Sequence, residues 1–168
     1  MNVQALERYR ETLAESVVFA GLSPDELELI MRSCRLVDVS AGQTLLSEGV
    51  KGDGLYVILE GAIEFFLPDR SAAGVHRPSR VRLNVLGPGR CFGEYGVIDD
   101  QASSASAQAL SAARLCLLVT GELRRIVNER DRIGKVIYAN LLRFLVSRLR
   151  AKDRELDIVM FADEPDGP

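Results

Sequence analysis

Histidine is nearly missing from this sequence, which contains one such residue, His76, among 168. A small β-barrel of the cupin kind needs a cluster of His and Glu ligands to hold a catalytic metal, and one histidine cannot supply it. His76 itself lies in a polar loop, where a surface position is expected. No Ser/His/Asp set or Walker loop is evident, and the adjacent acids Asp99 and Asp100 favour a turn. The sequence therefore predicts no metal site and no enzyme.

Cysteine is also scarce. The three cysteines, Cys34, Cys91 and Cys116, are odd in number and far apart, and each lies among apolar residues. That pattern predicts reduced core residues instead of a disulfide or metal framework.

Long apolar runs and basic clusters are missing too. No run of about 18 apolar residues occurs, and the opening MNVQALERYRE carries charges where a signal peptide needs apolar residues. The net charge is -3, and lysines and arginines are scattered. We therefore expect a soluble, cytoplasmic protein without a membrane or nucleic-acid partner.

The length and the hydrophobic content of the chain are sufficient for one hydrophobic core. With 168 residues and 47% hydrophobic content, a single domain over residues 1–168 is expected. Helical spacing of apolar residues predicts an amphipathic helix over 2–17. Ser23 and Glu26 then form a capping box around Pro24, so a second helix is expected to about Cys34. These helices make up an N-terminal part, residues 1–34.

From Arg35 the apolar pattern alternates, as in strands. Strand candidates between glycine-containing turns are 36–39, 44–46, 55–59, 62–66, 81–85, 103–109 and 114–119. Many short strands with such turns predict an antiparallel barrel or sandwich over 35–119. The segment 68–80 is longer than a hairpin needs, and we expect it to be a mobile, solvated loop.

Two helices are expected over 120–160, the first capped by Thr120, and the acidic residues 161–168 are expected to be a disordered tail. The last helix has apolar residues at heptad spacing, with Lys152 continuing the period, and a second apolar face beside them. Two faces favour a homodimer through this helix, with the alternative that both pack within one chain. The residues of the expected dimer seam are Tyr138, Leu142, Leu145, Leu149, Leu156 and Val159, and those of the second face are Val136, Ile137, Leu141 and Phe144.

Three pieces of the sequence carry a resemblance to a known family. They are Glu48-Gly49, GDGLYVILEG at 52–61 and LGPGRCFGE at 86–94. In this order and spacing they are similar to the cyclic-nucleotide-binding domain of bacterial CRP/FNR regulators and of protein-kinase-A regulatory subunits, over about residues 18–150. The resemblance implies an α+β fold, in which an antiparallel β-roll or jelly-roll barrel is flanked by N-terminal helices and a long C-terminal helix.

The resemblance also implies a phosphate-binding cassette at 91–106. In that family a glutamate accepts the ribose 2′-hydroxyl, while backbone groups of a short helical turn and an arginine about nine residues later hold the cyclic phosphate. Glu94 matches the glutamate, whereas the arginine position falls on Ser103. The ligand-binding residues so implied are Phe92, Gly93, Glu94, Tyr95, Gly96, Ser103, Ser104, Ala105 and Ser106.

No lysine or arginine lies between Cys91 and Ala113, so the family's phosphate cation is missing. Removing such a buried charge-assisted contact costs roughly 2–5 kcal/mol of binding, and Glu94 without a cation makes the pocket negative. Candidates for a replacement are Arg82, Arg143 and Arg148. Polar candidates for reading the base from the last helix are Asn140, Ser147 and Arg148.

Two functions remain open. The first is a stand-alone, homodimeric regulatory module that senses a small ligand, with cAMP or cGMP possible, and signals to a separate protein partner that the sequence does not identify. The second is an interaction scaffold whose pocket is vestigial and binds no nucleotide. In the transcription-factor members a winged helix-turn-helix follows the long helix, and here we expect no DNA-reading element.

Overall fold

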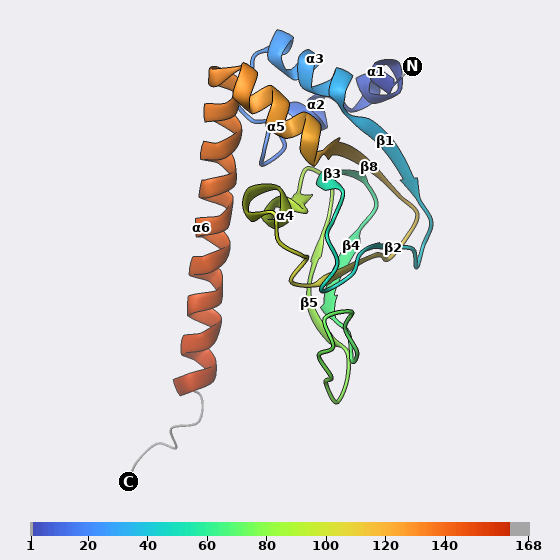
Figure 1. Ribbon diagram of the computed structural model, residues 1–168, viewed down its shortest axis with the longest axis vertical. Coiled ribbons are helices and arrows are strands. Elements are labelled where there is room, and N and C mark those ends of the chain that lie inside the picture. Colours follow the sequence, from blue (N-terminus) through green and yellow to red (C-terminus); the bar gives the residue numbers. More distant parts are fainter. Residues whose placement is uncertain (1, 162–168) are drawn as a thin grey trace.

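Two antiparallel sheets of four strands each form a β-roll, with helices gathered at one end and one long helix running along its side (Figure 1). The computed structural model describes residues 2–161, with side chains from residue 4 to residue 155. This is the α+β architecture that the sequence predicts. The tail expected at 161–168 lies outside the described residues, except for Phe161, which ends the long helix.

The first sheet has the strand order β1-β8-β3-β6 and the second the order β2-β7-β4-β5. Each strand expected from the sequence is present, although the one expected over 103–109 begins only at Ser106. The sequence did not predict β6, because two residues are too few to show alternation. The strands are β1 (Arg35–Val39), β2 (Thr44–Leu46), β3 (Gly54–Glu60), β4 (Ile63–Leu67), β5 (Val81–Leu86), β6 (Cys91–Phe92), β7 (Ser106–Ala109) and β8 (Ala113–Val119).

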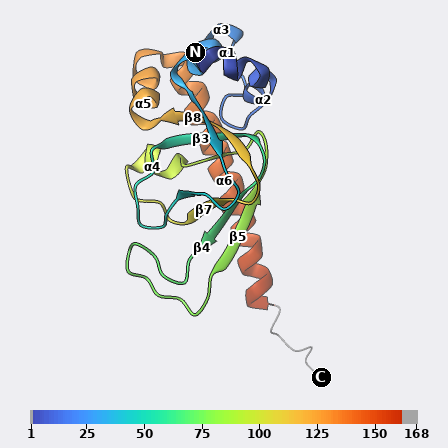
Figure 2. The same cartoon turned by 90° about the vertical axis from the view of Figure 1, so that its right-hand side faces the viewer.

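The helices lie mostly at one end of the roll, except for a short helix within the cassette and the long last helix (Figure 2). They are α1 (Asn2–Leu6), the 3-10 helix η1 (Glu7–Tyr9), α2 (Arg10–Ala14), α3 (Pro24–Ser33), α4 (Glu94–Asp99), α5 (Thr120–Glu129) and α6 (Asp131–Phe161). None of them combines the length and apolarity needed to cross a membrane, within the described part of the chain.

The N-terminal helices correct one prediction and confirm another. The single helix expected over 2–17 is interrupted by the tighter turn of η1. There Tyr9 is buried and its hydroxyl donates to Glu60 of β3 at 2.6 Å. The capping box of α3 is confirmed: Ser23 Oγ accepts from the Glu26 backbone, and the Glu26 carboxylate accepts from the Ser23 backbone. Such a cap contributes about 1 kcal/mol.

Strand β3 divides two hydrophobic cores. Its residues from Gly54 to Leu59 are all buried. Alternate side chains point to opposite faces of a strand, so Leu55 and Val57 pack toward the helices while Tyr56 and Ile58 pack between the sheets. This double burial fixes the register of β3 and, with it, the position of its neighbour β6.

The three cysteines are buried in the core beneath the helices, and none forms a disulfide, as the sequence predicts. A hydrogen bond with Cys116 and burial raise the pKa of Cys34, and burial raises that of Cys91.

The loop over 68–80 is largely exposed, as expected, but the side chain of Arg77 anchors it to the roll. Arg77 donates to both carboxylate oxygens of Glu48, at 2.7 and 2.8 Å, and to the carbonyl of Pro68. Within the loop, Arg70 and His76 form an isolated β-bridge. A bidentate guanidinium–carboxylate pair is among the strong polar contacts, so this pair holds the loop against the turn after β2.

A candidate ligand pocket between the cassette and helix α6

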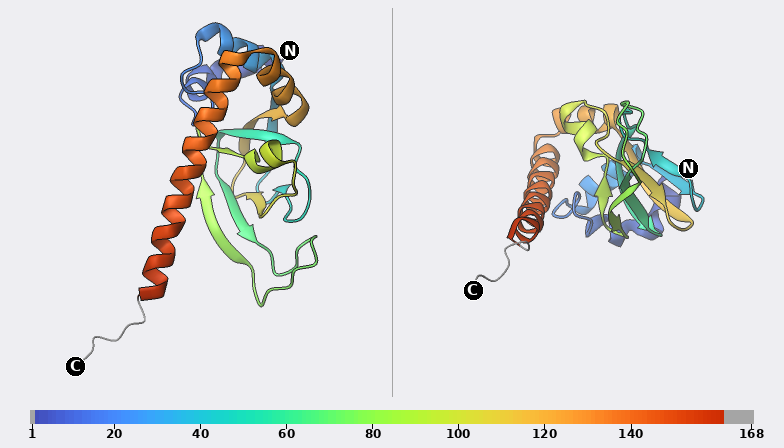
Figure 3. Two further views of the ribbon diagram at one scale, coloured as in Figure 1. Left: turned by 60° about the vertical axis from the view of Figure 1, so that its left-hand side comes forward. Right: turned by 90° about the horizontal axis from the view of Figure 1, so that it is seen from below.

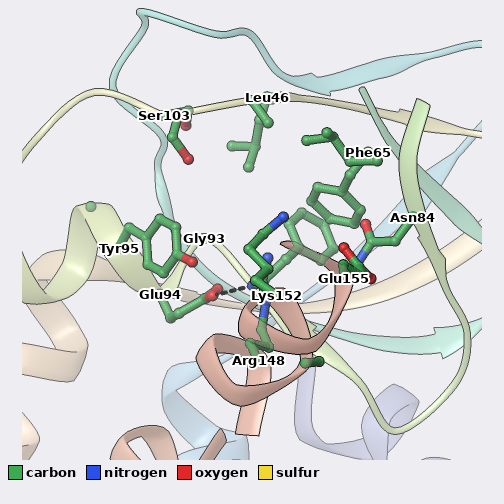
Figure 4. A pocket seen from close by; sticks show the side chains of 16 residues that line it. Leu46, Phe65, Asn84, Gly93, Glu94, Tyr95, Ser103, Arg148, Lys152 and Glu155 are labelled. Carbon is green, nitrogen blue, oxygen red and sulfur yellow. Dashed lines mark hydrogen bonds and ion pairs between the residues drawn. The ribbon is translucent and has the colours of Figure 1, made fainter. Parts of the chain in front are cut away.

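A hollow of about 250 Å³ opens between the roll, the cassette and α6 (Figure 4). This volume lies just below the range of about 300–1,000 Å³ that is usual for small-molecule sites. Its wall is apolar on the side of the roll and carries charges on the side of α6. The lining residues are Leu46, Phe65, Leu83, Asn84, Phe92, Gly93, Glu94, Tyr95, Gly96, Ser103, Ser104, Ala105, Arg148, Ala151, Lys152 and Glu155.

Gly93 places the cassette at one wall of the pocket. Its φ of 84° lies in the left-handed region, and a Cβ on it would meet the Gly54 carbonyl oxygen at 2.2 Å. Only glycine fits both conditions, so the chain can pass closely over β3 and begin α4 at once. Beside it, the rings of Phe92 and Tyr56 stack with their centroids 4.8 Å apart. Together these contacts fix where Glu94 emerges.

Glu94 is the first residue of α4, and its side chain reaches α6. It is 2% exposed, and one carboxylate oxygen accepts a hydrogen bond from Arg148 at 2.9 Å. The Arg148 guanidinium also lies 5.6 Å from the ring centroid of each of Tyr95 and Phe144. Burial raises the pKa of the Glu94 carboxyl, while backbone hydrogen bonding and Arg148 lower it. Burial is the largest of these influences, and the pKa of Glu94 is raised on balance.

The far side of the cassette is held by the turn after β2. The Ser103 backbone donates to the Val50 carbonyl at 2.9 Å and accepts from Gly49 at 2.8 Å. Ser103, Ser104 and Ala105 consequently line the pocket, and β7 begins only at Ser106. Ser106, which the resemblance included among the ligand-binding residues, does not line it. Its buried hydroxyl accepts a hydrogen bond from the Glu48 backbone at 3.0 Å.

Of the contacts proposed from outside the cassette, Arg148 lines the pocket and the others have different partners. Arg82 pairs with Glu64 at 2.5 Å. On α6, Asn140 donates to the carbonyls of Val18 and Ala20, Arg143 donates to Asn140, and Ser147 donates to the carbonyl of Phe144.

Lys152 and Glu155 are pocket residues that the sequence reasoning missed. Lys152 follows Arg148 by four residues, one helical turn, so the two side chains share a face of α6. That spacing is a usable signal, but Lys152 also continues the heptad period, and the sequence alone does not connect it with the pocket. Leu83 and Asn84 of β5 and Phe65 of β4 reach the pocket only through strand pairing.

The expected dimer seam on α6 faces solvent where it is described. Leu142 is 64% exposed, Leu149 is 62% exposed and Leu145 is half-buried. The second face, by contrast, packs on the helices, with Ile137 and Leu141 buried. The alternative that both faces pack within one chain is therefore wrong at Leu142 and Leu149. The side chains of Leu156 and Val159 lie outside the described ones.

The roll, the glycine-positioned cassette and the buried glutamate define a class of binding domain. The cyclic nucleotide-binding domain family matches residues 36–130 of this chain. The chain belongs to that family. Among the described side chains, no group of three or more His, Cys, Asp or Glu is placed to hold a metal ion.

Two bacterial proteins are similar to this chain in sequence. The chain is 29% identical over 155 residues to the CRP-like cAMP-activated global transcriptional regulator of Mycobacterium tuberculosis, covering 92% of this chain and 65% of that protein. It is 30% identical over 148 residues to the cyclic AMP receptor protein of Thermus thermophilus, covering 88% and 64%. It thus spans somewhat less than two thirds of these relatives.

Solved structures agree in fold. The catabolite activator protein of Thermus thermophilus superposes with a TM-score of 0.71 at 29% identity, covering 87% of this chain and 64% of that one. A cyclic nucleotide-binding domain from Methylobacillus flagellatus superposes with a TM-score of 0.77 at 22% identity, covering 97% and 88%. The second comparison bears on the fold alone.

Proposed function

We propose that this chain is a regulatory module that binds a cyclic nucleotide, cAMP or cGMP, in the pocket between the cassette and α6. The observation that carries the proposal is the buried carboxylate of Glu94 on the pocket wall. A carboxylate there can accept a ribose hydroxyl. Tyr95 and Gly96 follow Glu94 along the same wall, where the family presents backbone donors to the phosphate.

The charge of the pocket supports this function better than the sequence suggested. The charged lining residues are Arg148 and Lys152 against Glu94 and Glu155, so two positive charges offset two negative ones. A pocket that is neutral overall does not repel a singly charged phosphodiester. The absence of an arginine at Ser103 therefore does not by itself exclude binding.

The module acts as a homodimer through the exposed seam of α6 and signals to a separate protein. Support for the dimer comes from Tyr138, Leu142 and Leu149, which are 48%, 64% and 62% exposed at heptad spacing. Exposed apolar side chains in one stripe are typical of a helix that pairs with another copy.

Isothermal titration of the full chain with cAMP, cGMP and cyclic dinucleotides tests the function. We expect binding of a cyclic mononucleotide and a loss of about 10-fold or more in affinity for Glu94→Ala, since a hydrogen bond to a charged group is removed. Asp153→Ala removes an exposed carboxylate of α6 that does not line the pocket, and should bind as the native chain does. If none of these nucleotides binds at high micromolar concentration, the proposed function fails and the interaction scaffold with a vestigial pocket is supported instead.

A further inference from the structure

We propose that the cation facing the nucleotide phosphate is Lys152, on α6 instead of in the cassette, so that bound nucleotide clamps α6 to the roll. This inference rests on the proposed function and specifies how it is regulated. The cassette offers no cation, because neither lysine nor arginine occurs between Cys91 and Ala113. The cations on the pocket wall, Arg148 and Lys152, both belong to α6.

The two cations of α6 are in different situations. Arg148 is held by Glu94 at 2.9 Å and lies close to the rings of Tyr95 and Phe144. Lys152 takes part in none of the ion pairs formed among the described side chains, and its ammonium group points into the pocket (Figure 4). It lines the same pocket as Ser103, where the family's arginine position falls. Lys152 is therefore available to a phosphate without breaking an existing pair.

The position of this lysine matters because the outer half of α6 has little else to hold it. All residues from Leu149 to Glu155 are exposed, and this part of the helix stands apart from the roll (Figure 3). The pair between Arg148 and Glu94 joins it to the cassette. A phosphate held by the cassette backbone on one side and by Lys152 on the other adds a second link, one helical turn further out.

A cation in the cassette would bind the phosphate without involving α6. A cation on α6 makes the order of that helix depend on the ligand, because the ammonium–phosphate contact forms only when the helix lies against the pocket. The native chain should therefore gain hydrogen-exchange protection beyond Arg148 when nucleotide binds.

The test compares Lys152→Ala with Arg150→Ala, which removes a neighbouring exposed cation that does not line the pocket. We expect Lys152→Ala to weaken nucleotide binding by about 10- to 100-fold, the effect of removing a charge-assisted contact. Arg150→Ala should change the affinity less than about 3-fold. Lys152→Arg should keep the charge and most of the affinity.

A rescue variant separates binding from clamping. Adding Ser103→Arg to Lys152→Ala returns a cation to the cassette, so the affinity should recover while the ligand-induced protection of α6 should not. Native affinity in Lys152→Ala alone would overturn the inference and leave the proposed function intact. If the native chain binds no cyclic nucleotide, the proposed function itself fails, and the inference with it.

Discussion

Glu94 and Arg148, 54 positions apart in the sequence, are joined by a hydrogen bond of 2.9 Å that links the start of the cassette to the long helix. The carboxylate is almost fully buried, whereas the arginine side chain is 34% exposed. The Glu94 carboxylate is thus almost fully desolvated, whereas the Arg148 guanidinium remains partly solvated. Two predictions follow from that asymmetry.

The first concerns pH. Burial raises the pKa of Glu94 above its ordinary value of 4.5, so the folded chain binds this proton more tightly than the unfolded chain does. The stability gained from protonation is present at low pH and is lost as pH rises through the raised pKa. Glu94→Gln, which stays neutral, should match the native melting temperature near about pH 4 and exceed it near about pH 7.5. Thermal denaturation across this range measures the difference, and the opposite sign at neutral pH would show that the ion pair outweighs burial.

The second concerns Arg148→Met, which keeps the length of the side chain and removes its charge. Glu94 then lacks its cation, and we expect a loss of about 1 kcal/mol at neutral pH, a value reduced by the exposure of the arginine. The loss should shrink at acid pH, where Glu94 is protonated. Urea denaturation at the two pH values provides the measurement, and Arg150→Met serves as the control. An equal loss at both pH values would point to packing against Tyr95 and Phe144 instead.

Replacing Gly93 is predicted to destabilise the fold. Gly93→Ala forces a side chain into a left-handed position against the Gly54 carbonyl, so we expect a loss of about 2–4 kcal/mol. Gly121→Ala is the matched control, because a Cβ on Gly121 of α5 meets nothing within 4 Å. That variant should gain about 0.5–1 kcal/mol by restricting the unfolded chain. Chemical denaturation measures the free energy of unfolding of both variants, and similar values for the two would contradict the prediction.

The anchored loop gives a prediction about local order. Arg77→Ala removes the partner of Glu48, a side chain that is 10% exposed, and should cost about 2 kcal/mol. It should also speed proteolysis and hydrogen exchange within 68–80. Arg70→Ala, in the same loop but at an exposed position, should do neither. Unchanged exchange in Arg77→Ala would mean that the β-bridge between Arg70 and His76 suffices.

The exposed seam predicts self-association. The double change Leu142→Ser and Leu149→Ser should convert a dimer of the native chain into a monomer in sedimentation experiments, because both side chains are apolar and more than half exposed. Arg154→Ser, at another exposed position of α6, should leave the dimer intact. A native chain that sediments as a monomer would remove the proposed assembly.

The fold could be predicted from the sequence because its signals are local. The capping box at Ser23, the short apolar run of β3 and the glycines at tight turns each specify a few residues, and together they specify the roll. The two residues of β6 show no pattern of their own and are placed by pairing with Tyr56 and Val57. The broken first helix depends on the distant partner of Tyr9, which no local pattern reveals.

The site was less predictable, because it is assembled from elements that are far apart in the sequence. The resemblance named the cassette wall, and Arg148 was one of several candidates for a cation. Ser106 was carried over with the motif, although its hydroxyl is used by the Glu48 backbone. Lys152 fits the heptad and the pocket face equally well in sequence, and only the position of α6 against the cassette separates the two assignments.

Helix α6 has 31 residues, which corresponds to a rod of about 45 Å. Its inner end is fixed by Ile133, Ile137 and Leu141, which are buried under the helical core. The remaining 20 residues, from Leu142 to Phe161, form a lever arm of about 30 Å. A tilt of about 10° at the fixed end would move the tip by about 5 Å. Under the proposed function, such a tilt would carry the effect of ligand binding from the pocket to a surface that a partner protein can contact without touching the ligand.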